Sequence, residues 1–217
     1  TYSTSCVATD IFVHNNYAYV IDIDSGLIVI DVSDKLHPRR VGKFTLNNVY
    51  AMYIKNEYAY IGTSDGLHII NISDPQHPVR VGYYNTPSIV AQLYVSNNYA
   101  YLANWDAGFY IMDVIDPESP NVVAHIDIDS VCGVSIYGNH AYVIGYRGGL
   151  YVIDISQPTA PKKIGEYKGF NNYHLMEVQA ISYRMILVSC TNGNLYVLDV
   201  SHPASITEAD RYKCGYG

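Results

Sequence analysis

The sequence is poor in charge and in long apolar runs. Charged residues make up 15% of the 217 residues, whereas soluble domains usually contain about a quarter. The net charge is −7 and the basic residues are scattered, which argues against nucleic acid because that partner requires a concentrated basic face. No apolar run is long enough to span a bilayer, and the first residues do not resemble a signal peptide. The chain opens within a repeat, which suggests a mature product or a fragment of something longer.

Motifs that carry chemistry are also missing. The four cysteines form no C-x-x-C pair and the histidines form no H-E-x-x-H pair, so zinc is not expected. There is no G-x-S-x-G elbow and no glycine-rich phosphate loop. Asp22 and Asp24 faintly resemble the opening of a calcium loop, but the closing glutamate is missing and turn formation explains them better. We therefore expect no metal, no cofactor and no catalytic residues.

A repeat of about 41 residues organises the chain. The dipeptide Ala-Tyr occurs at positions 18–19, 59–60, 100–101 and 141–142, and an apolar run that ends in Asp or Asn follows each copy. The fifth copy has drifted to Met185–Leu187 and comes four residues late. A unit of this length cannot bury its own apolar surface, so it must stack on its neighbours.

Each unit contains four short β-rich runs separated by turn signals. In the second unit these runs are residues 49–54, 58–62, 67–72 and 79–84. Four such runs in a period near 40 residues are typical of one propeller blade, and no run is long enough for a helix. We predict an all-β fold, a five-bladed β-propeller with four antiparallel strands per blade. Residues 1–217 form one domain, with blades at approximately residues 6–46, 47–87, 88–129, 130–170 and 171–214.

The repeated segments resemble LVIVD repeats. The resemblance rests on Gly-Leu-Ile-Val-Ile-Asp-Val-Ser at 26–33, Gly-Leu-Tyr-Val-Ile-Asp-Ile-Ser at 149–156 and the Asp-Pro-x-x-Pro turns at 74–78 and 116–120. It covers nearly the whole chain and implies a propeller. Because such repeats occur in bacterial and archaeal surface or secreted proteins, it also implies an extracellular or cell-surface location. The family offers no general catalytic residues to carry over.

Candidate binding residues lie where the units differ. In a propeller, function sits on loops around the central channel. The loops between the second and third runs contain Trp105 and Asp106 in the third unit, and Tyr146 and Arg147 in the fourth. Aromatic rings beside an arginine suit a sugar, a peptide side chain or a carboxylate. The first runs and the insertion of the fifth unit add polar candidates for the channel: Tyr50, Gln92, His174 and Glu177.

Structural roles are the alternative for each of these residues. Trp105 is equally suited to capping the core between two blades. The polar candidates are also consistent with hydrated lining of a channel that binds nothing.

Two cysteines stand near the chain ends. In a closed ring the ends meet, so a disulfide between Cys6 and Cys214 would lock the closure in an oxidising compartment. Two unrelated thiols are the alternative, because sequence does not determine connectivity. Cys132 and Cys190 fall in adjacent units and fit buried free thiols.

These features favour a non-catalytic extracellular or cell-surface propeller that serves protein–protein binding or assembly, including self-association. The first alternative is a carbohydrate-binding propeller with sugars near Trp105 and Tyr146. The second is a hydrolase or lyase that uses Arg147, His174 and Glu177 across the central channel. No nucleic-acid partner and no membrane-spanning segment are expected.

Overall fold

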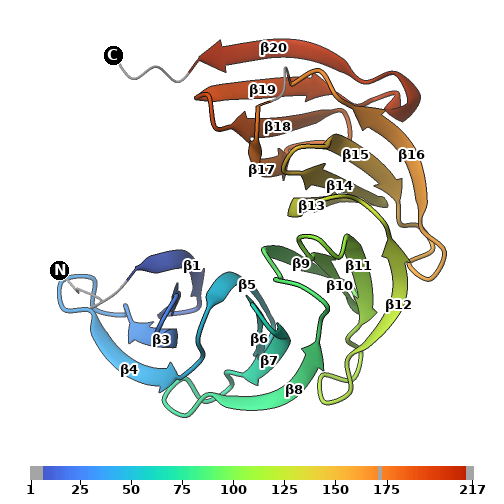
Figure 1. Ribbon diagram of the computed structural model, residues 1–217. Coiled ribbons are helices and arrows are strands. Elements are labelled where there is room, and N and C mark those ends of the chain that lie inside the picture. Colours follow the sequence, from blue (N-terminus) through green and yellow to red (C-terminus); the bar gives the residue numbers. More distant parts are fainter. Residues whose placement is uncertain (1–6, 171–172, 214–217) are drawn as a thin grey trace.

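The computed structural model describes residues 7–170 and 173–213 (Figure 1). This part of the chain forms five four-stranded antiparallel sheets, each built from four consecutive strands. The prediction of an all-β fold with five blades of four antiparallel strands is confirmed. Within these residues, no helix is long and apolar enough to cross a membrane.

The strands of each blade run in chain order from the inner to the outer side of the molecule. Blade 1 has β1 (Ala8–His14), β2 (Tyr17–Asp22), β3 (Gly26–Asp31) and β4 (Arg39–Phe44). Blade 2 has β5 (Val49–Lys55), β6 (Tyr58–Thr63), β7 (Gly66–Asn71) and β8 (Val79–Asn85). Blade 3 has β9 (Gln92–Ser96), β10 (Tyr99–Ala103), β11 (Phe109–Asp113) and β12 (Asn121–Ile126). Blade 4 has β13 (Val131–Tyr137), β14 (His140–Gly145), β15 (Gly149–Asp154) and β16 (Lys162–Tyr167). Blade 5 has β17 (Leu175–Ala180), β18 (Met185–Cys190), β19 (Asn194–Asp199) and β20 (Thr207–Lys213), with a short 3-10 helix η1 (Pro203–Ser205).

Tight turns explain the short strands. Asn15, Asn56, Asn97 and Gly138 occupy the same repeat position between the first and second strands, with φ between 51° and 57°. Asn and Gly tolerate this left-handed conformation, which two-residue hairpins require. In the fifth unit a loop of four residues, 181–184, replaces the two-residue turn. These two additional residues account for part of the four-residue delay of the fifth copy.

Apolar side chains between neighbouring blades form the core. We define the front face of a blade by the positions of Tyr19, Leu27 and Val29, and the rear face by those of Met52 and Ile54. The front face of blade 1 packs on the rear face of blade 2, and the same pairing recurs at the other three contacts between successive blades. Alternate strand residues point to opposite faces, so blades 2, 3 and 4 each contribute to two such layers.

A glycine on the fourth strand allows the blades to approach closely. A Cβ atom at Gly42 would lie 2.0 Å from the carbonyl oxygen of Pro75 in the next blade, and one at Gly82 would lie 1.9 Å from that of Pro117. Gly165 has the same relation to Pro203, at 1.9 Å. At these three contacts the backbone of one blade therefore rests directly on the turn of the next, which the missing side chain of glycine permits.

The five blades follow one another along an arc. Strand β1 packs on β5, β5 on β9, β9 on β13 and β13 on β17. Blades 1 and 5 lie on opposite sides of an opening (Figure 1). The sequence predicts that the chain ends meet, but the rotation from blade to blade depends on side-chain packing that the repeat period does not reveal. Cys6 and Cys214, the predicted disulfide partners, lie outside the described residues.

Candidate functional site

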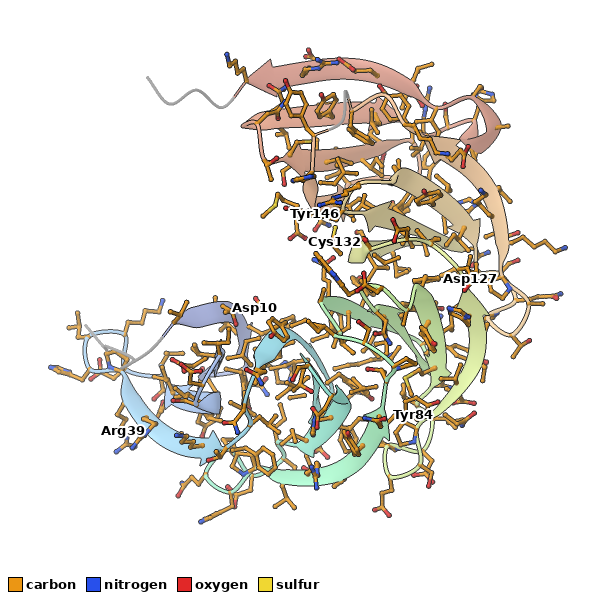
Figure 2. All side chains as sticks on the ribbon, in the orientation of Figure 1. Asp10, Arg39, Tyr84, Asp127, Cys132 and Tyr146 are labelled. Carbon is orange, nitrogen blue, oxygen red and sulfur yellow. The ribbon has the colours of Figure 1, made fainter. Side chains whose placement is uncertain are left out.

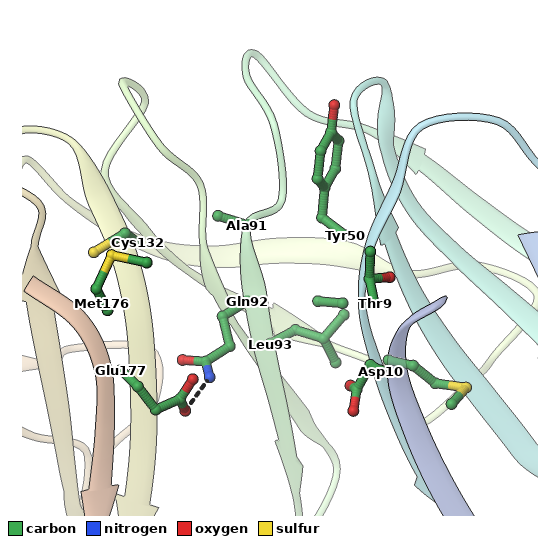
Figure 3. Close-up of a pocket in the computed structure, with 11 residues that line it drawn as sticks. Thr9, Asp10, Tyr50, Ala91, Gln92, Leu93, Cys132, Met176 and Glu177 are labelled. Carbon is green, nitrogen blue, oxygen red and sulfur yellow. Dashed lines mark hydrogen bonds between the residues drawn. The ribbon is translucent and has the colours of Figure 1, made fainter. Parts of the chain in front are cut away.

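The first strands of the blades line one polar cavity of about 290 Å³, the inner cavity (Figure 3). Two adjacent repeat positions supply all of its polar side chains, together with Cys132 and Met176: Thr9, Asp10, Tyr50, Gln92 and Glu177. Asp10, Cys132 and Tyr146 lie toward the inner side of the arc, whereas Arg39 lies on the outer strand β4 (Figure 2). The predicted residues Tyr50, Gln92 and Glu177 thus contribute to one cavity.

Gln92 connects three blades at this cavity. Its Nε2 donates a hydrogen bond of 2.6 Å to Oε1 of Glu177 in blade 5 (Figure 3). Its Oε1 accepts a hydrogen bond of 2.6 Å from the backbone N–H of Val134 in blade 4. Gly133 makes room for it, since a Cβ there would lie 3.2 Å from the same Oε1. The amide is therefore held in one orientation, because its donor and acceptor have different partners.

The inner cavity is acidic. Burial raises the pKa of Asp10 and of Glu177, and the negative charge of Asp10 adds to the shift at Glu177. No Lys, Arg or His is among the described residues that line the cavity. Burial also raises the pKa of the Cys132 thiol to about 12, so it is not an activated nucleophile. The cavity therefore suits a cationic or hydrogen-bonding group better than an anion.

Three aromatic rings from blades 3, 4 and 5 form what we call the aromatic ladder. The ring centroids of Trp105 and Tyr146 are 5.5 Å apart, and those of Tyr146 and His174 are 4.2 Å apart with the rings nearly parallel. All three side chains are half-buried. Since His174 precedes Met176 of the inner cavity by two residues, the ladder and the cavity are neighbours.

Backbone hydrogen bonds between blades position the ladder. The carbonyl oxygen of Trp105 accepts a bond from the N–H of Val131 at 2.9 Å, and that of Tyr146 accepts one from Leu175 at 3.1 Å. The backbones of Trp105 and Tyr146 are therefore each attached to the first strand of the following blade. The relative positions of the rings follow from the stacking of blades, although each ring is on a loop.

The backbone at Trp105 is strained. Its φ is 28°, a region that bulky side chains rarely occupy. The preceding Asn104 is fully buried, and neither Oδ1 nor Nδ2 has a hydrogen-bond partner among the described residues. Strain of this kind persists only where the surroundings enforce it, and it is concentrated at functional sites.

Two predicted residues lie elsewhere. Arg147 lines a separate cavity of about 140 Å³ with Lys168 and Tyr173. Asp106 lines a third cavity of about 250 Å³ with Asp127 and Asp129. Arg147 and Glu177 therefore line different cavities. The hydrolase or lyase alternative, which uses Arg147, His174 and Glu177 together, stays a prediction. In the described ranges 7–170 and 173–213, no group of three His, Cys, Asp or Glu residues could hold a metal ion.

Asp10 is the residue that sequence reasoning missed, although a signal existed. Asp10, Ala51, Gln92, Gly133 and Glu177 occupy one repeat position, paired with equivalent residues of the second strand. Two of these residues are small and three are polar. Comparing the units at this single position would have identified Asp10 as a partner of the two predicted residues.

Comparison with solved structures supports the fold. The chain resembles the WD40 β-propeller domain of Doa1 with a TM-score of 0.76 and 12% identity, over 98% of this chain and 70% of that one. It resembles BamB from Moraxella catarrhalis with a TM-score of 0.72 and 14% identity, over 94% and 60%. A functionally unknown protein from Desulfotomaculum acetoxidans gives a TM-score of 0.81 and 10% identity, over 98% and 72%. The chain thus spans 60% to 72% of the length of these three structures, and at such identities the likeness concerns the fold alone.

The sequence comparisons place the chain in a family. No curated protein matches it. The family model described as "LVIVD repeat" matches five segments that together make up most of the chain: residues 7–45, 49–86, 89–127, 129–169 and 186–214. The chain belongs to the LVIVD-repeat family of β-propellers.

Proposed function

We propose that this propeller is a non-catalytic binding module, outside the cell or at the cell surface, that holds a segment of a partner protein on its inner side. The observation that carries the proposal is the aromatic ladder beside the inner cavity. Rings from three blades meet there, and the backbone of Trp105 is strained in a way that packing of the repeats does not require. Aromatic residues of this kind are enriched in the energetic centres of protein interfaces.

The charges indicate which segment would fit. The carboxylates of Asp10 and Glu177 face a cavity without a basic residue, so a lysine or arginine of the partner would gain most there. The ladder offers ring faces to an aromatic or guanidinium group. The preferred ligand is thus an extended peptide that carries a basic residue close to an aromatic one.

Peptide selection followed by fluorescence tests this proposal. Random peptides are selected on the immobilised chain, and the enriched peptides are titrated while the emission of Trp105, the sole tryptophan, is recorded. We expect basic–aromatic peptides to be enriched, and Tyr146→Ala and Glu177→Gln each to weaken binding about tenfold or more. Tyr183→Ala, at a residue 65% exposed in the β17–β18 turn, is the matched control. If the enriched peptides bind the Tyr146→Ala variant as well as the unchanged chain, the proposal fails.

The near-parallel stack of Tyr146 and His174 favours carbohydrate binding as a second candidate. Sugar rings stack on aromatic faces of this size, and the half-buried ladder leaves part of each ring open to solvent. A glycan array decides this alternative. Glycan hits that disappear in Tyr146→Ala, with no Tyr146-dependent peptide, would replace the first proposal by the second.

A further inference from the structure

Blade stacking in this chain is directional. Every contact between successive blades pairs a front face with the rear face of the following blade. Within the described residues, this leaves the rear face of blade 1 and the front face of blade 5 without a neighbouring blade (Figure 1). The two end faces therefore show which blades could be added to the arc.

The rear face of blade 1 keeps the residues of a contact surface but exposes some of them. Ile11 and Val13 are 61% and 62% exposed, whereas Met52 and Ile54, at the same repeat positions of blade 2, are 5% and 4% exposed. Leu36 is 83% exposed in the turn that, in later blades, rests on the glycine of the preceding blade. Farther out on this face four apolar residues are already buried, each 5% to 7% exposed: Ala18, Val20, Ile28 and Ile30. The exposed part of the face thus comprises its inner edge and its docking turn.

The front face of blade 5 differs at one decisive position. The residue that pairs with Val29 or its equivalent is Gly42, Gly82, Ala124 and Gly165 in blades 1 to 4. In blade 5 the equivalent pair is Val197 with Asp210. At Gly42, Gly82 and Gly165 a backbone carbonyl oxygen of the following blade lies within about 2 Å of the Cβ position, and the equivalent residue of blade 3 is the small Ala124. A following blade in that arrangement would leave no room for a longer side chain. Asp210 would therefore clash with it and place a carboxylate against a carbonyl oxygen.

We propose that the rear face of blade 1 is a docking surface for a further blade of the LVIVD type, and that Asp210 prevents blade 5 of a second copy from occupying it. The occupant presents an apolar front face with glycine or alanine at the position of Gly42. Continuity with the four contacts inside the arc supports this occupant.

The state of association of three variants tests the proposal. By sedimentation velocity, we expect the unchanged chain to remain a monomer and Asp210→Gly to form head-to-tail oligomers as its concentration rises. Adding Ile11→Lys and Val13→Lys to Asp210→Gly should restore the monomer. Thr207→Gly, on the same strand β20, is the matched control and should remain monomeric.

Two outcomes of this experiment would overturn the proposal. An Asp210→Gly chain that stays monomeric while its circular dichroism spectrum is unchanged would mean that the rear face of blade 1 does not accept such a blade. An unchanged chain that already associates, and loses association with Ile11→Lys and Val13→Lys, would mean that a second copy is the occupant and Asp210 is no barrier.

An extended chain gives a second measurement if Asp210→Gly does not fold. It carries a duplicate of residues 7–48 before Val7, so that the duplicate can offer its own Gly42 to blade 1. Ile11→Lys and Val13→Lys in the original blade should lower the urea midpoint of the extended chain and leave that of the 217-residue chain unchanged. Gly42→Asp in the duplicate should remove this difference. Equal effects in both chains would show that no docking occurs.

Discussion

Gln92 provides the sharpest test of how the inner cavity is held together. Replacing it by leucine keeps most of its volume and removes both of its hydrogen bonds, to Val134 and to Glu177. The N–H of Val134 then has no acceptor in a partly buried position, which typically costs about 1–3 kcal/mol. The bond to Glu177 adds less, because that carboxylate remains accessible to solvent. We expect the free energy of unfolding to fall by about 2 kcal/mol.

Urea unfolding measures this loss, with Trp105 emission and far-ultraviolet circular dichroism as two probes. Gln179→Leu is the matched control, because Gln179 is exposed on β17 and, among the described residues, its side chain bonds only to the carbonyl oxygen of the adjacent Ala180. A Gln92→Leu loss no greater than that of Gln179→Leu would refute the view that Gln92 ties blades 3, 4 and 5 together.

Gln92→Glu separates the two hydrogen bonds. The new carboxylate still accepts from the N–H of Val134, but it cannot donate to Glu177 while ionised and repels it instead. We expect this variant to be less stable than the unchanged chain at pH 7. The difference should shrink as the pH falls and one carboxyl group takes up a proton. A difference that does not change with pH would show that Gln92 and Glu177 do not interact in solution.

Three further predictions follow from the described contacts. Burial raises the pKa of Glu177, so the folded chain binds the proton of this carboxyl group more tightly than the unfolded chain does. The chain therefore loses stability as the pH rises from the unfolded-state pKa to the folded-state pKa of Glu177. Glu177→Gln should raise the melting temperature relative to the unchanged chain at pH 7 and not at about pH 4. Gly82→Ala should lower the free energy of unfolding in urea by about 1–3 kcal/mol, because its Cβ would overlap the next blade. In a chain whose other cysteines are serine, Cys132 should react with a thiol reagent at pH 8 only after unfolding, since its pKa is about 12.

The repeat alone predicts most of the fold. Ala-Tyr at fixed spacing marks the second strand of four blades, and the turns with Asn15, Asn56 and Asn97 are set by local conformational preference. These features depend on neighbours in sequence, so a single sequence reveals them. The open arc depends on how far each blade rotates against the next, which the side chains of two blades decide together, and spacing carries no information about it.

Only part of the candidate site could be predicted, because the repeat gives the position of a loop but not the direction of its side chains. Trp105 and Tyr146 occupy equivalent loops of successive blades, and their ring centroids lie 5.5 Å apart. Arg147 follows Tyr146 directly but lines a different cavity, and the direction of adjacent loop residues is not encoded in the period. The Gln92–Glu177 bond joins residues 85 positions apart, and only the stacking of blades brings them into contact.

Departure from the repeat has a different meaning at different positions of the fifth unit. On its front face no described blade follows, so residues there are free of the packing that enforces glycine at Gly42 and Gly82. Asp210 is therefore relevant to the association of blades and is not evidence for a ligand-binding site. Glu177 lies on the first strand and is polar where blades 2 and 4 have Ala51 and Gly133, and Val178 beside it still packs on blade 4. A polar residue retained at a stacked position, bonded to Gln92 and facing an acidic cavity, is therefore the stronger evidence for a binding role.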